Sequence, residues 1–130
     1  MHSDRRLLTA SVLSILLFTL HWADEISRGI EPGTINAVGG FAILAVWLWA
    51  TLVFSARRWG MVLVLVGAVF AAGVPILHMT GHGYVGGRIQ PNSPGAFFWV
   101  WTNLALGACG WVSLALSIGA LVNWRKRVER

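Results

Sequence analysis

The sequence predicts an all-α membrane protein: one domain over residues 1–130, folded as a bundle of four transmembrane helices. Hydrophobic residues make up 56% of the chain and charged residues only 12%, whereas soluble domains carry about 25% charged residues. The apolar residues form four long runs, and short basic clusters flank these runs. A domain of this size cannot bury so much apolar surface, so we expect the lipid bilayer as its first partner.

Four spans are expected, at about residues 7–22, 35–54, 59–79 and 96–122. No small-x-small cleavage site follows the first run, so we interpret it as an uncleaved helix and not as a signal peptide. Arg57 and Arg58 form a very short turn, which makes the second and third helices antiparallel neighbours. Pro75 is expected to kink the last turn of the third helix.

The basic residues predict the orientation in the membrane. Four spans place both termini on one side, together with eight basic residues: Arg5, Arg6, Arg57, Arg58, Arg125, Lys126, Arg127 and Arg130. Only Arg28 and Arg88 fall on the other side. The positive-inside rule then predicts a cell (inner) membrane protein with cytoplasmic termini and with loops 23–34 and 80–95 outside. Because basic residues beside spans explain the net charge of +5, we expect no nucleic-acid partner.

The two halves of the sequence resemble each other faintly. A Leu-His step ends the first and third spans, at His21 and His78, and a proline follows each step before the next span, at Pro32 and Pro91. This pattern favours two parallel helical-hairpin repeats related by an axis along the membrane normal, with chance similarity as the alternative. A true duplication would let His21 and His78 face one another across the bundle.

Most of the chain's candidate ligands fall at the predicted outer face. His21, Asp24 and Glu25 share one helix face through i+3 and i+4 spacing, and His78 and His82 form an i+4 pair. Imidazoles at this spacing, together with carboxylates, are typical of sites for zinc or another transition metal. The sequence therefore predicts a metal site whose ligands come from five residues: His21, Asp24, Glu25, His78 and His82.

Three other interpretations use the same region. A b-type haem would need two facing imidazoles as cofactor ligands, for which His21 and His78 are the candidates. A proton-linked site for a quinone or other small ligand would use these histidines, with walls from Trp99, Trp101 and Asn103. The third interpretation has no joint role for these residues, and Asp24 or Glu25 would then simply pair with Arg28 along one helical turn.

The fourth span repeats small residues every four positions, a pattern suited to close helix packing: Ala105, Cys109, Ser113 and Ser117. This stripe and the eight tryptophans also suit a structural accessory subunit of a larger respiratory, photosynthetic or transport complex. A small transporter that works as a homo-oligomer is the third functional hypothesis. The sequence contains no phosphate-binding loop, nucleophile elbow or H-E-x-x-H motif, so no ordinary enzyme class is predicted.

Overall fold

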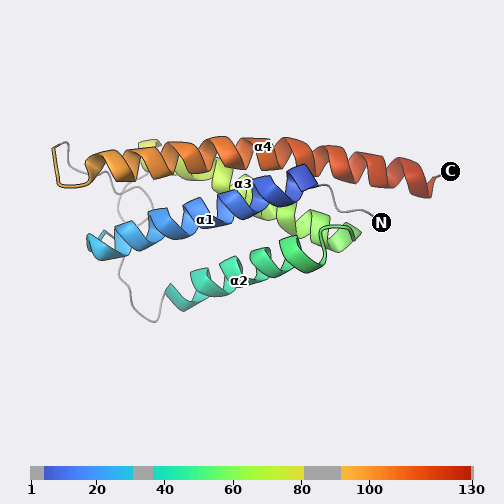
Figure 1. The fold of residues 1–130 in the computed structure, drawn as a ribbon, viewed down its shortest axis with the longest axis horizontal. Coiled ribbons are helices and arrows are strands. Elements are labelled where there is room, and N and C mark those ends of the chain that lie inside the picture. The colour runs from blue at the N-terminus through green and yellow to red at the C-terminus, as the bar shows by residue number, and fades with distance from the viewer. Residues whose placement is uncertain (1–4, 31–36, 81–91, 130) are drawn as a thin grey trace.

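A computed structural model describes residues 5–30, 37–80 and 92–129, in which four helices form one up-and-down bundle (Figure 1). The helices are α1 (Arg5–Ser27), α2 (Val38–Val53), α3 (Arg58–Thr80) and α4 (Ala96–Val128). Helices α1 and α3 run in one direction, and α2 and α4 run in the other (Figure 1). The start of α1 and the end of α4 therefore lie at the same end of the bundle. The predicted all-α, four-helix architecture is confirmed.

Three of the helices, α1, α3 and α4, are long and apolar enough to cross a membrane. Helix α1 has 23 residues, about 34 Å at a rise of about 1.5 Å per residue, which exceeds a hydrocarbon core of about 30 Å. Helix α2 is apolar but has only 16 residues, about 24 Å. The structure thus lengthens the first predicted span, because the polar stretch after residue 22 continues the helix as far as Ser27.

Helix α4 packs along both α3 and α1, and α2 lies against α3 and α1 on the side away from α4 (Figure 1). Two glycines of α4, Gly107 and Gly110, lie directly against α3. A Cβ at Gly110 would collide with the backbone at Ala72, and Gly107 accommodates the ring of Pro75. Of the predicted stripe, Ser113 and Ser117 are fully buried and Ala105 and Cys109 are half-buried.

A cluster of buried hydroxyl groups, with one indole N–H, joins α1 to α2 and α4. We call it the hydroxyl cluster; it consists of Ser11, Ser14, Trp47, Thr51 and Ser113. The Ser11 Oγ atom lies 2.8 Å from Thr51 Oγ1 and accepts a 3.0 Å hydrogen bond from Trp47 Nε1. Ser14 Oγ lies 3.3 Å from Ser113 Oγ, which connects α1 to α4. Such interhelical bonds contribute about 0.6 to 2 kcal/mol each in a membrane.

The charged residues divide sharply between the two ends of the bundle. Within the described ranges, seven basic residues lie at the end where α1 begins and α4 finishes: Arg5, Arg6, Arg57, Arg58, Arg125, Lys126 and Arg127. We call this the basic end. Arg28, just after α1, is the one basic residue of the described ranges at the opposite end. There the last turns of α1 and α3 meet the first turns of α4.

Candidate metal centre

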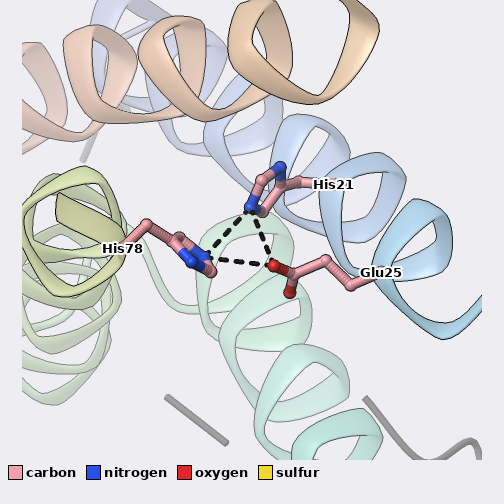
Figure 2. A group of neighbouring side chains, drawn as sticks. All are labelled: His21, Glu25 and His78. Carbon is pink, nitrogen blue, oxygen red and sulfur yellow. Dashed lines mark hydrogen bonds and ion pairs between the residues drawn. The ribbon is translucent and has the colours of Figure 1, made fainter. Parts of the chain in front are cut away.

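Three ionisable side chains converge at the end of the bundle opposite the basic end. His21 and Glu25 come from α1 and His78 comes from α3; we call these three residues the triad. Figure 2 shows all three side chains pointing toward one another across the gap between the two helices. His21 is 2% exposed, Glu25 is 5% exposed and the His78 side chain is 10% exposed. The triad is therefore a buried polar group and not a solvated surface cluster.

The three facing atoms of the triad form a nearly equilateral triangle. His21 Nε2 lies 3.2 Å from His78 Nε2 and 3.6 Å from Glu25 Oε1, and His78 Nε2 lies 3.3 Å from the same Oε1 atom (Figure 2). A tetrahedral ion with bonds of about 2.0 Å holds its ligand atoms about 3.3 Å apart, whereas an octahedral ion with the same bonds holds adjacent ligand atoms about 2.8 Å apart. The triangle fits three corners of a tetrahedral coordination sphere.

Local helix geometry explains how the chain brings these residues together. His21 and Glu25 are four residues apart on α1, so their side chains lie one turn apart on the same face. His78 lies in the last turn of α3, just after Pro75. Because Gly107 leaves room for the Pro75 ring, the end of α3 can lie close to α4. The triad thus depends on one i+4 pair and on one close helix approach.

Thr102 of α4 fixes the tautomer of His21. The His21 Nδ1 atom lies 3.1 Å from Thr102 Oγ1. The Thr102 hydroxyl donates its only hydrogen to the backbone, where the Phe98 and Trp99 carbonyl oxygens lie 2.9 Å and 3.1 Å away. Thr102 must therefore accept a hydrogen bond from His21 Nδ1–H. It follows that the lone pair of His21 lies on Nε2 and faces the triad, as a metal-ligating imidazole requires.

Trp99 of α4 orients the carboxylate. Its indole Nε1–H donates a 3.3 Å hydrogen bond to Glu25 Oε1, the same oxygen that faces the two histidines. Its ring also contacts both imidazoles, with ring centroids 5.3 Å from His21 and 5.0 Å from His78. Trp99 was expected as a pocket wall, and the structure places it beside the triad. Thr102 and Trp99, three residues apart on α4, thus orient His21 and Glu25 of α1.

The other two predicted wall residues lie differently. Trp101 is 59% exposed on the surface of α4, and the structure does not bring it to the triad. Asn103 is buried, and its Oδ1 atom has no hydrogen-bond partner. Because Gly107 faces Pro75, Asn103 lies one turn nearer the triad end and at about the level of His78.

Asp24 does not join the triad. Its Oδ2 atom accepts a 2.7 Å hydrogen bond from Arg28 Nε, and Arg28 Nη1 donates a 2.6 Å hydrogen bond to the Pro94 carbonyl. The hydrogen bond from Arg28 to Asp24 raises the pKa of the guanidinium, which lies beyond the last residue of α1. This pair ties the end of α1 to the turn before α4. His82, the fifth predicted ligand, lies outside the described residues.

The distances favour a single ion over a haem. An iron with two axial imidazoles would hold their nitrogens on opposite sides, about 4 Å apart at bonds of about 2.0 Å. Here the two Nε2 atoms are 3.2 Å apart and a carboxylate oxygen lies within 3.6 Å of both. The structure brings together three of the five predicted ligands, and these three were all identified from the sequence. Thr102 was missed, because only the contact between α1 and α4 reveals its role.

The chain matches no protein-family model, no curated protein and no solved structure. The interpretation of the triad therefore rests on its own atoms. An ionisable group buried in an apolar bundle is costly unless it is paired, and in membrane helices such groups are typical of functional sites.

Proposed function

We propose that this chain is a small integral membrane protein that binds one divalent transition metal ion at the triad, with zinc as the best fit. The observation that carries the proposal is the triangle of His21 Nε2, His78 Nε2 and Glu25 Oε1, with sides of 3.2, 3.3 and 3.6 Å. Two histidines and one glutamate are a known zinc ligand set, in which the fourth position remains open to another ligand.

The proposed location of this ion is the outer face of the membrane, with both termini in the cytoplasm. The support is that seven of the eight basic residues in the described ranges lie at the end remote from the triad. Helix α2 is proposed as the fourth span, and its length of about 24 Å would require a locally thinner bilayer. The parallel helices α1 and α3 each contribute one histidine, which supports an internal duplication (Figure 1).

The proposed role is metal handling at the outer face. An open fourth position lets an incoming donor reach the ion before any protein ligand leaves, so an ion can be received and passed on by ligand exchange. Loading must also move a hydrogen. With the His21 lone pair on Nε2, we infer that His78 Nε2–H is the hydrogen in the 3.2 Å bond between the histidines. A metal would bind this nitrogen, and the hydrogen would move to His78 Nδ1, since a ligating imidazole is neutral.

The test is elemental analysis and an absorption spectrum of protein purified in mild detergent from zinc-supplemented cells. The proposal predicts about one ion per chain in the wild type, almost none in His78→Ala, and an unchanged content in the matched control Ser11→Ala. A wild-type protein without metal would contradict the proposal. A Soret band would show that the protein binds a haem instead of a single ion. The variant His82→Ala tests whether that histidine supplies the fourth ligand.

A second candidate is a structural accessory subunit, favoured by an apolar cavity of about 510 Å³ beside α2. Its walls include Phe18, Trp22, Ile43 and Phe70, and a helix of a partner protein would cover them. A partner that co-purifies with the wild type and is lost in Ile43→Ala would support this candidate. Purification of the wild type without any partner in mild detergent would exclude it.

A further inference from the structure

A second cavity, of about 610 Å³, lies between α1 and α4 toward the basic end. We call it the α1–α4 groove. Its size is that of a site for a ligand of several hundred daltons. Its walls are apolar along most of their length, and two arginines lie at one end; the residues that matter here are Arg5, Arg6, Leu13, Cys109, Val112 and Leu116. The triad is at the other end of the bundle, so the two sites are separate.

The α1–α4 groove has the dimensions of one membrane leaflet. From Arg5 to Leu13 the helix rises about 12 Å, which is most of the roughly 15 Å half-thickness of a hydrocarbon core. The two arginines begin α1, where a span enters the headgroup region, and the apolar walls continue toward the bilayer centre. A phospholipid has the same division, with a charged headgroup at one end and hydrocarbon beyond it.

We propose that the α1–α4 groove binds one anionic phospholipid from the leaflet at the basic end. Arg5 and Arg6 bind the headgroup phosphate, since guanidinium groups match phosphate oxygens with paired hydrogen bonds. One acyl chain lies along Leu13, Val112 and Leu116 in the groove. The bound lipid fills the space between α1 and α4 that side chains leave open, and its negative charge complements the two arginines. This proposal does not depend on the metal site.

A diffuse attraction between the basic end and anionic lipids is the competing explanation. Seven positive charges near a membrane surface draw anionic lipids without any defined site. The chain offers a matched control, because Arg125 and Lys126 lie at the same end and do not line the groove. Replacing either pair with glutamine removes the same charge. Only a defined site makes the two double variants differ.

The experiment is native mass spectrometry of the full chain in mild detergent, after incubation with equal amounts of phosphatidylglycerol and phosphatidylcholine. We expect one phosphatidylglycerol per wild-type chain, preferred about tenfold over phosphatidylcholine. In Arg5→Gln/Arg6→Gln the preference falls to about one. In Arg125→Gln/Lys126→Gln it stays within about twofold of the wild type.

A third variant, Ala108→Trp, fills the groove and leaves both arginines in place, because Ala108 is an exposed residue of the groove wall. We expect it to retain neither lipid while keeping wild-type helicity by circular dichroism. Equal retention of the two lipids by the wild type would overturn the proposal. So would an equal loss of preference in both double variants, or full lipid retention by Ala108→Trp.

Discussion

The bundle contains two buried polar clusters that share α1 and are built in different ways. The hydroxyl cluster and the triad both connect α1 to other helices, and both include a tryptophan N–H as a donor, from Trp47 in one and Trp99 in the other. In the hydroxyl cluster each group is neutral and carries a hydrogen for every bond that it donates. In the triad two ring nitrogens and a carboxylate oxygen converge at distances of 3.2 to 3.6 Å, and the inferred hydrogen on His78 Nε2 is the one hydrogen among these three atoms.

This difference separates a structural polar cluster from a candidate metal site. Neutral hydroxyls satisfy one another and need nothing further, so the hydroxyl cluster is a means of helix association. The triad could hold a metal ion, and the contacts of Thr102 with His21 and of Trp99 with Glu25 orient two of its three side chains.

The largest effect is expected for Glu25→Gln, which keeps the shape of the side chain and removes its charge. Zinc affinity should fall by more than about 100-fold, because an amide is a poor zinc ligand. Loss of a residue that only orients a ligand costs about 10- to 100-fold, and loss of a direct ligand should cost more. Competition with a chromogenic chelator measures the affinity. Ser14→Ala, in the hydroxyl cluster, should bind zinc like the wild type. Equal zinc affinities for the wild type, Glu25→Gln and Ser14→Ala would show that Glu25 is not a zinc ligand.

The next effect is expected for Thr102→Val, which removes the acceptor of His21 Nδ1–H and keeps the side-chain shape. His21 can then adopt the other tautomer, so zinc affinity should fall by about 10- to 100-fold. The matched control is Thr51→Val, which makes the same change in the hydroxyl cluster and should leave the affinity unchanged. If the two threonine variants bound zinc equally well, the inferred tautomer would be wrong.

Acid should weaken zinc binding at the triad and leave the hydrogen bonds of the hydroxyl cluster unaffected. Zinc and protons compete for the imidazole and carboxylate lone pairs, so affinity falls as pH falls, by about tenfold per pH unit for each proton displaced. Calorimetric titrations in buffers of different ionisation enthalpy count those protons. Because a neutral His78 keeps its hydrogen by changing tautomer, we expect few protons released per ion at neutral pH and about one or more per ion in acid. A proton release that does not increase as pH falls would contradict the competition.

The smallest effect is expected for Trp47→Phe, which removes the N–H donor to Ser11 and keeps an aromatic ring. The free energy of unfolding should decrease by about 1 kcal/mol, the scale of one interhelical hydrogen bond. Thermal unfolding in detergent measures the change, and zinc stoichiometry should stay at the wild-type value. A loss of zinc in this variant would mean that the two polar groups are coupled through α1.

The sequence predicted the parts of this structure that depend on local periodicity. Apolar runs and basic clusters indicated the helices, and i+4 spacing placed His21 and Glu25 on one face. The same reasoning included Asp24, which the structure instead pairs with Arg28, because i+3 and i+4 positions differ by about 100° around a helix. Thr102, Gly107 and Gly110 went unrecognised, since their roles depend on which face of α4 meets α1 and α3.

X-ray absorption spectroscopy of the zinc-loaded protein tests the central claim most directly. The triad predicts a four-coordinate zinc with two imidazole nitrogens and one carboxylate oxygen at about 2.0 to 2.2 Å, and with imidazole scattering that disappears in His21→Ala/His78→Ala. A six-coordinate shell of oxygen atoms alone, or a spectrum that this double variant leaves unchanged, would contradict it.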